Sequence, residues 1–143
     1  MQTQLMLYTD LSTYLETLEN RPQTTRFCFE SFLAFAKTHQ LTRLPSYVIT
    51  IAGTNGKGSV AALLEAFFLS AGYSVGCFSS PHVLVPNERI RHNGANLSDA
   101  ALLDALNTAA ASFSGANDWG YFCQFFLAAL CSFKTLLPDI VIL

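Results

Sequence analysis

The sequence predicts an α/β fold with three layers, in which helices flank a mostly parallel β-sheet. Three short apolar segments, residues 48–51, 75–78 and 139–143, are typical of buried strands, and the last is expected in the middle of the sheet. Segments with apolar residues at helical spacing separate these strands along the chain. A strand, a helix and a second strand in succession form a right-handed crossover unit, which makes the two strands parallel.

Two helices are expected before the first strand. The first runs from Asp10 to Glu19, with Asp10 or Ser12 as its N-terminal cap and Arg21-Pro22 beyond its end. The second lies within residues 24–38, and most of its aromatic residues are interpreted as core. The apolar residues that share one face are Leu11, Tyr14, Leu15 and Leu18 in the first helix and Phe29, Phe32, Leu33 and Ala36 in the second.

A glycine-rich loop follows the first strand. From Gly53 to Ser59 the chain reads Gly-Thr-Asn-Gly-Lys-Gly-Ser. Glycines accept positive φ angles and can therefore point successive N–H groups into one concavity, where they bind anionic oxygens. Lys57 adds a positive charge, and the helix expected from Ser59 to about Ala71, stopped by Gly72, presents its N-terminal dipole to the same place. This order of elements predicts a phosphate cradle, so the fold is expected to be P-loop-type.

The loop departs from the standard phosphate-binding pattern of a glycine, four residues and Gly-Lys-Ser/Thr. Ile51 occupies the position of the first glycine, and Gly58 separates Lys57 from Ser59. The alternative is a glycine-rich turn between a strand and a helix, with a solvated lysine. The cradle is favoured because the strand, glycines, lysine, hydroxyl and helix all occur in the required order.

Later segments continue the alternation of strands and helices. Ligands bind at the carboxyl ends of parallel strands, so Ser80, after the second strand, is expected to face the phosphates. Residues 88–92 alternate in polarity and precede Asn93-Gly94, which predicts a hairpin. The remaining elements are expected to be a helix from Ser98 to about Ala110, a polar loop over residues 112–118 and a helix from Gly120 to about Phe133.

The charged residues of the hairpin have two interpretations. The planar guanidinium group of arginine binds carboxylates through two hydrogen bonds, so Arg89 and Arg91 are candidates for carboxylate recognition. They fit equally well as solvated flanks of the hairpin. His82 and His92 are interpreted as surface residues, and no metal site is assigned to them. The four cysteines form no Cys-x-x-Cys pair and are interpreted as buried thiols rather than catalytic groups.

Length and composition limit the classes of function. A chain of 143 residues with 51% hydrophobic and 13% charged residues is typical of one globular domain. The net charge of −2, with lysines and arginines scattered, argues against nucleic acid as a partner. No apolar run reaches the length of a membrane span, and the N-terminus lacks the regions of a signal peptide. We therefore expect a cytoplasmic protein with no membrane partner.

Several segments resemble the folylpolyglutamate synthase and dihydrofolate synthase branch of the Mur ligase family. The first is similar to the nucleotide loop of that branch, the next three to its loop after the second strand, and the last to a later strand. In order, they are Gly53–Ser59, Phe78–His82, Asn87–Arg91, Asn93-Gly94 and Asp139–Leu143. The resemblance extends from Tyr47 to Leu143 and is weak before Arg43.

The resemblance implies an ATP-dependent carbon–nitrogen ligase that adds L-glutamate to folate or dihydropteroate, a reaction of folate biosynthesis and one-carbon metabolism. In this family ATP phosphorylates the carboxylate, and the amine of glutamate then displaces phosphate from the acyl phosphate. ATP and Mg²⁺ are the implied cofactors, and the fold would be part of the central domain of a Mur ligase. A full-length relative is expected to be monomeric.

The resemblance also implies roles for individual residues. Lys57 is implied as the catalytic cation. The residues implied to bind the nucleotide are Gly53, Thr54, Asn55, Gly56, Lys57, Gly58 and Ser59. Ser80 and Ser59 are implied as metal ligands. The candidates for substrate binding are His82, Arg89, Tyr121 and Phe122.

The chain departs from the family pattern at three places. Gln23–Phe27 stands where bifunctional relatives have an Ile-Asp-Leu-Gly-like segment that helps to hold the pterin. Tyr121–Gln124 lacks the glutamate that relatives carry beside an aromatic residue on the folate side. The chain stops at Leu143, where relatives continue with Glu-Val-Gly, whose glutamate is a magnesium ligand.

These departures lead us to expect the N-terminal part of the ATP-binding domain of a longer ligase. Residues 1–42 would form a helical lead-in and residues 43–143 a truncated P-loop α/β core, with the C-terminal domain absent. The chain by itself is expected to be inactive. Two other classes remain open: a catalytically silent nucleotide-binding fragment, which would bind ATP without turnover, and a small P-loop kinase, which would yield a phosphorylated acceptor.

Overall fold

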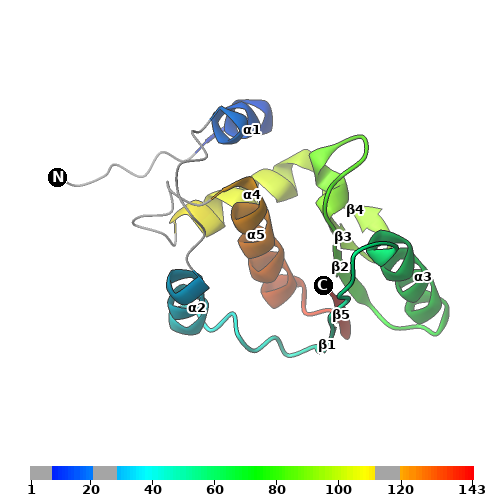
Figure 1. Ribbon diagram of the computed structural model, residues 1–143. Coiled ribbons are helices and arrows are strands. Elements are labelled where there is room, and N and C mark those ends of the chain that lie inside the picture. Colours follow the sequence, from blue (N-terminus) through cyan, green and yellow to red (C-terminus); the bar gives the residue numbers. More distant parts are fainter. Residues whose placement is uncertain (1–7, 21–28, 112–119) are drawn as a thin grey trace. The chain divides into compact units, whose positions relative to one another are not determined.

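The computed structural model describes residues 8–20, 29–111 and 120–143 (Figure 1). The chain falls into two compact units. The first unit comprises the chain up to Arg43 together with Asp99–Cys131, and the second comprises Leu44–Ser98 and Ser132–Leu143. Our predictions for Gln23–Phe27, for Cys28, for the start of the second helix and for the polar loop 112–118 lie outside the described residues.

The first unit is helical. Its elements are α1 (Leu11–Glu19), α2 (Phe29–Thr38), α4 (Asp99–Ala111) and the larger part of α5 (Tyr121–Leu136). The Asp10 carboxylate accepts a 2.9 Å hydrogen bond from the backbone N–H of Thr13, so Asp10 is the cap of α1. The hydroxyl of the buried Tyr14 donates a 2.8 Å hydrogen bond to Oε1 of Gln124. None of the helices in the described ranges combines the length and hydropathy of a membrane span.

A mixed sheet of five strands organises the second unit. The strands are β1 (Tyr47–Ile49), β2 (Val75–Phe78), β3 (Ile90–His92), β4 (Ala95–Asn96) and β5 (Ile140–Ile142). Their order is β1-β5-β2-β3-β4, in which β5 is parallel to both β1 and β2. β3 and β4 extend the sheet as an antiparallel hairpin beside β2. The predicted α/β fold is confirmed, with a parallel core and an antiparallel edge.

The two faces of this sheet are covered by different helices. α3 (Lys57–Ser70) packs on one face, where its Ala61 joins the buried residues Val75, Cys77, Ile140 and Ile142. Because side chains alternate along a strand, Gly76 faces the other side, where the buried Phe133 near the end of α5 lies against it. The second unit therefore has the predicted three layers. Gly72, with a φ of 87°, ends α3 as expected.

Some predicted boundaries and environments were wrong. β1 was expected to be buried but lies at the edge of the sheet, where Tyr47 is 81% exposed, while β5 occupies the predicted central position with all of its residues buried. Glu88 and Arg89 were expected in a strand but lie in a 3₁₀-helix, η1 (Pro86–Arg89), because proline at its first position favours a helical turn. α3 begins at Lys57 rather than Ser59. The turn at Asn93-Gly94 is confirmed by positive φ angles at both residues.

Gly76 gives a direct test of this packing. A Cβ at Gly76 would lie 2.7 Å from two ring atoms of Phe133, and this ring is fully buried and has little room to move. We therefore expect Gly76→Ala to lower the free energy of unfolding by about 1–3 kcal/mol, as overpacking does in other cores. Urea denaturation measures the change. Gly120→Ala is the control, because a Cβ there meets nothing within 4 Å; equal stability of the two variants would contradict the close contact.

Candidate functional site

The glycine-rich loop joins β1 to α3 at the carboxyl end of the strand. Gly53 and Gly56 have φ angles of 151° and 77°, which residues with a Cβ rarely adopt, so both positions favour glycine. The ammonium group of Lys57 donates to the carbonyl oxygens of Gly53 at 2.6 Å and Thr54 at 3.1 Å. The loop therefore curls around the charge of Lys57. All seven residues from Gly53 to Ser59 are exposed and so accessible to a ligand.

The N-terminus of α3 adds to the positive field of the loop. Its first backbone hydrogen bond runs from the N–H of Val60 to the carbonyl of Gly56 at 2.9 Å. The N–H groups of residues 57–59 come before this bond and therefore have no partner within the helix. Such N–H groups bind anions, and the helix dipole favours negative charge at the same end. A Cβ at Gly58 would meet nothing within 4 Å, and the φ there is not strained. Packing among the described residues therefore leaves open space at Gly58, where an anion has access.

The loop after β2 brings three predicted site residues together. Arg89, only 8% exposed, donates from Nη1 to the hydroxyl oxygen of Ser80 at 3.0 Å and from Nε to Nδ1 of His82 at 2.9 Å. Nδ1 of His82 is the acceptor of this bond, so Arg89 orients the imidazole ring within the loop. Arg89 is thus buried within the loop rather than a solvated flank of the hairpin.

The carboxylate of Glu88 fixes the backbone of the same loop. Its Oε2 accepts a hydrogen bond from the N–H of Val83 at 2.7 Å, and its Oε1 accepts from those of Leu84 and Val85, each at 3.0 Å. The loop is therefore held in one conformation although the side chains of Val83 and Leu84 are 86% and 84% exposed. No role for Glu88 was predicted from the sequence. The available signal was an acid in the first turn after Pro86, where a carboxylate can cap free N–H groups.

The hydrogen bonds to Glu88 make the order of this loop depend on pH. The N–H groups of Val83 and Val85 hold the pKa of Glu88 below its usual range. A carboxyl group with a lowered pKa in the folded state stabilises that state above its unfolded pKa, about 4.3, and loses this effect as the pH falls through the folded value. We expect Glu88→Gln to lower the melting temperature at pH 7, with the difference from the parent chain narrowing below about pH 4. Thermal denaturation across this pH range measures the melting temperatures, with Glu19→Gln, a change at an exposed residue, as the control. If the melting temperature of Glu88→Gln differs from that of the parent chain by the same amount at every pH, the charge of Glu88 has no such role.

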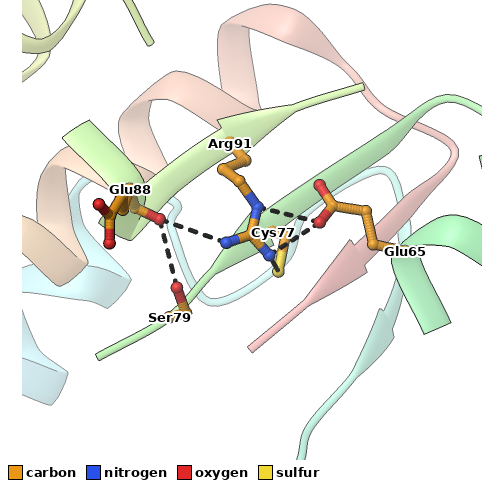
Figure 2. Close-up of polar contacts among 5 residues, drawn as sticks. All are labelled: Glu65, Cys77, Ser79, Glu88 and Arg91. Atoms are coloured by element: carbon orange, nitrogen blue, oxygen red, sulfur yellow. Dashed lines mark hydrogen bonds and ion pairs between the residues drawn. The ribbon is translucent and has the colours of Figure 1, made fainter. Parts of the chain in front are cut away.

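Arg91 binds a carboxylate within the chain. Its Nη2 lies 2.7 Å from Oε2 of Glu65 on α3, and it also donates to the sulfur of Cys77 at 3.3 Å (Figure 2). Burial raises the pKa of the Cys77 thiol to about 11, so this cysteine stays protonated at neutral pH, as expected for a structural thiol. The pairing of Glu65 was not predicted from the sequence. The available signal was that Glu65 is the sole charged residue of α3 after Lys57.

Known proteins of similar sequence are enzymes of folate metabolism. No protein-family model matches the sequence. The dihydrofolate synthase/folylpolyglutamate synthases of Buchnera aphidicola subsp. Acyrthosiphon pisum and Escherichia coli K12 are each 35% identical to it, over 133 and 134 residues. Each alignment covers 93% of this chain and 32% of the relative. The chain is homologous to these synthases. It spans about a third of the length of the curated relatives it matches.

Solved synthase structures share the fold of this homologue. Escherichia coli FolC in complex with DHPP and ADP has a TM-score of 0.85 and 33% identity, with 96% of this chain and 33% of that one covered. The bifunctional folylpolyglutamate synthase/dihydrofolate synthase of Yersinia pestis is represented by a structure with AMPPNP and a Mn ion. This structure has a TM-score of 0.84 and 34% identity, and the match covers 96% of this chain and 33% of the Yersinia pestis chain. The α/β fold predicted from the resemblance is therefore the fold of these synthases.

The candidate folate-side residues of this synthase homologue belong to the first unit, whereas the loop residues and Ser80, His82 and Arg89 belong to the second. Tyr121 and Phe122 lie in the first turn of α5, where their rings stack on Phe125 and Phe126, with centroid distances of 4.6 and 6.0 Å. Gln124, in the segment where a glutamate was expected, is buried beside Tyr14. A neutral amide suits this position, because an ionised carboxylate there would be costly to bury.

The hydroxyl oxygens of Ser59 and Ser80 are donors of the kind that a hard divalent cation binds. Ser59 is exposed in the first turn of α3, and the hydroxyl oxygen of Ser80 keeps a lone pair beyond the one that accepts from Arg89. Among the described residues, no cluster of three or more His, Cys, Asp or Glu side chains is arranged to hold a metal. Phosphate oxygens and water would therefore have to supply most of the ligands, as they commonly do for Mg²⁺.

Proposed function

We propose that this chain forms the nucleotide-binding part of an ATP-dependent carbon–nitrogen ligase that adds L-glutamate to folate or dihydropteroate. The observation that carries the proposal is the loop from Gly53 to Ser59, which wraps Lys57 and ends on the N-terminus of α3. Its support is the 35% identity to synthases of this name. Solved relatives with ADP, AMPPNP, DHPP and L-glutamate bound support the substrate class.

We propose a domain organisation for the chain as well. Residues 1–42 would be a helical lead-in and residues 43–143 part of a P-loop core of the Mur ligase type. Because the chain spans about a third of its relatives, we propose that the other groups of the active site lie in parts that the relatives have beyond the matched span. The chain alone would then bind nucleotide without completing the ligation.

In the proposed reaction, a carboxylate oxygen of the folate-type substrate attacks the γ-phosphorus of ATP, and the bond to ADP breaks. The amine of glutamate then attacks the acyl carbon, loses a proton and expels phosphate, which leaves an amide. The N–H groups of residues 57–59 and the ammonium of Lys57 would hold the phosphate oxygens and stabilise the charge that shifts between them. Lys57 would exchange a hydrogen bond to Gly53 or Thr54 for one to phosphate.

We propose Mg²⁺ as the metal ion, held by the hydroxyl groups of Ser59 and Ser80 together with phosphate oxygens. When bound, the ion neutralises phosphate charge. A Yersinia pestis relative with Mn and AMPPNP bound supports a divalent ion at such a site. The Arg89 guanidinium holds the Ser80 hydroxyl in one orientation, which fixes the direction of its remaining lone pair. We propose the cytoplasm as the compartment and a monomer as the state of a full-length relative.

We propose substrate-binding roles for residues of each unit, considered separately. In the second unit, His82 and Arg89 lie in the loop that carries Ser80 and would face the carboxylate that is phosphorylated. In the first unit, Tyr121 and Phe122 would contact the aromatic part of the folate. Phe122, which is 52% exposed, has surface available for such a contact.

Two measurements test the proposed function. Calorimetry of the chain with AMPPNP and Mg²⁺ should show saturable binding at one site, and the absence of binding would refute the nucleotide role. For the ligase role, a chimaera in which this chain replaces the matched third of Escherichia coli FolC should release phosphate from ATP only when glutamate and a folate-type substrate are present. Glutamate-independent phosphorylation of an acceptor would indicate a kinase instead. The same chimaera with Lys57→Ala is the control for activity that does not need this loop.

A further inference from the structure

We infer that Arg91 is a positioning residue, which holds the phosphate loop and the loop after β2 in one register so that both contact the same metal-bound nucleotide. This inference rests on the function proposed above. Its basis is a network of five residues, Glu65, Cys77, Ser79, Glu88 and Arg91, which links α3 to β2, β3 and η1 (Figure 2).

The guanidinium group of Arg91 contacts several elements at once. Nε and Nη2 donate to Oε2 of Glu65 on α3, at 2.9 and 2.7 Å, and Nη2 also donates to the sulfur of Cys77 on β2. Nη1 donates over 3.5 Å to the backbone carbonyl of Glu88, which also accepts a 3.2 Å hydrogen bond from the hydroxyl of Ser79. This reach depends on the planar fork of arginine, because a lysine ammonium is a single point of charge.

On the side of the phosphate loop, the network fixes α3. Glu65 follows Lys57 by eight positions on the same helix, a distance of about 12 Å along its axis. A helix transmits rotation and translation over this length as a rigid element. Holding Glu65 against β3 therefore sets the direction of Lys57 and of the N–H groups in the first turn.

On the side of the second loop, the network fixes Glu88. Arg91 and Ser79 hold its carbonyl, while its carboxylate holds the N–H groups of residues 83–85. The next residue, Arg89, donates to Ser80 and His82. Arg91 is bonded to both Glu65 and Glu88, and so it connects the loop that would hold phosphate to the loop that would hold the metal.

Stability alone does not explain why a charged pair occupies this position. Glu65 is 6% exposed, and its Oε1 is buried with no hydrogen-bond partner among the described residues. A buried pair with an unsatisfied oxygen often stabilises a fold less than apolar residues of the same shape. Apolar residues, however, do not fix the angles between three elements. The directed bonds of Arg91 do, which is the property that two cooperating loops require.

Arg91→Lys keeps the charge and loses the fork, so it tests the inference. We expect calorimetry to show that its affinity for ADP without metal stays within about twofold of the parent chain. The gain in affinity on adding Mg²⁺ should fall about tenfold, which corresponds to one charge-assisted hydrogen bond. Arg43→Lys, at an exposed arginine, is the matched control and should preserve both values.

Amide hydrogen exchange supplies a readout that needs no ligand. In Arg91→Lys, the N–H groups of residues 83–85 should exchange about tenfold faster, because the Glu88 anchor is loosened. The amides of β5 should keep their parental rates. Faster exchange throughout the second unit would show that Arg91 only stabilises the fold, and the inference would be wrong. Glu65→Gln, which keeps the shape without the charge, should reproduce the local pattern; unfolding of both variants would also overturn the inference.

The outcomes separate this inference from the proposed function. A parent chain that binds no ADP, with or without Mg²⁺, refutes the proposed function and the coupling to nucleotide with it. If Arg91→Lys keeps the full gain in ADP affinity on adding Mg²⁺, the positioning role is refuted and the proposed function is not. If Arg91→Lys loses this gain in affinity and only the amides of residues 83–85 exchange faster, the positioning role and the proposed function are both supported.

Discussion

Lys57→Ala is expected to weaken the binding of AMPPNP with Mg²⁺ about ten- to a hundredfold, the effect of losing one or more charge-assisted hydrogen bonds to phosphate. The ammonium group lies within the loop, where it contacts the carbonyl oxygens of Gly53 and Thr54. The side chain is exposed and does not belong to the buried core, so its removal leaves no buried cavity. Alanine is also a better helix former than lysine at the start of α3. Binding should therefore change while the fold does not.

Calorimetry measures the affinity of this variant, and circular dichroism measures its helix content and melting temperature. Lys37→Ala is the matched control, because Lys37 is an exposed lysine in the last turn of another helix. It removes the same net charge without touching the loop. If Lys57→Ala binds AMPPNP as tightly as the control, then Lys57 does not contact phosphate.

The sequence predicts this loop well because its geometry is encoded locally. Gly53 and Gly56 adopt the positive φ angles that their position between a strand and a helix suggests, and Lys57 begins the helix. Neighbouring residues determine these dihedral angles, so no distant contact has to be known. The same holds for the turn at Asn93-Gly94, where both residues have positive φ.

Strand environment is harder to predict because apolar content does not distinguish a central strand from an edge strand. β1 and β5 are both rich in β-branched residues, yet β5 is fully buried between β1 and β2 whereas β1 lies at the edge. Order within a sheet depends on pairings between distant segments. Residues 88–92 show a related limit: alternation alone favoured a strand, while Pro86 and the Glu88 carboxylate produce a 3₁₀-turn.

Glu65 illustrates why part of the candidate network was not predicted from the sequence. A lone acid in an apolar helix is normally placed on the solvated face, but Glu65 is buried and paired with Arg91, which lies 26 positions further along the chain. Only the packing of α3 on the sheet brings these residues together. The sequence contains the two charges, and the fold determines that they meet.

The two glycines that flank Lys57 allow backbone strain to be separated from ligand contact. Gly56 has a φ of 77°, where a Cβ costs about 1–2 kcal/mol, so we expect Gly56→Ala to lower the free energy of unfolding by that amount. Gly58 lies in the first turn of α3 without a strained φ, and a Cβ there meets nothing within 4 Å. Gly58→Ala should therefore keep or raise the free energy of unfolding, by up to about 1 kcal/mol.

The two variants are expected to differ in stability but not in the direction of their effect on binding: both should lose affinity for AMPPNP with Mg²⁺. A methyl group at Gly58 would stand beside the N–H groups that phosphate approaches, whereas a residue other than glycine at Gly56 would change the direction of the loop itself. Urea denaturation and calorimetry on the same samples measure stability and affinity. The distinguishing result is a Gly58→Ala chain that is as stable as its parent yet binds at least about tenfold more weakly, a loss comparable to one charge-assisted hydrogen bond. If Gly58→Ala keeps the parental affinity, phosphate does not approach the first turn of α3, and the empty space at Gly58 has another cause.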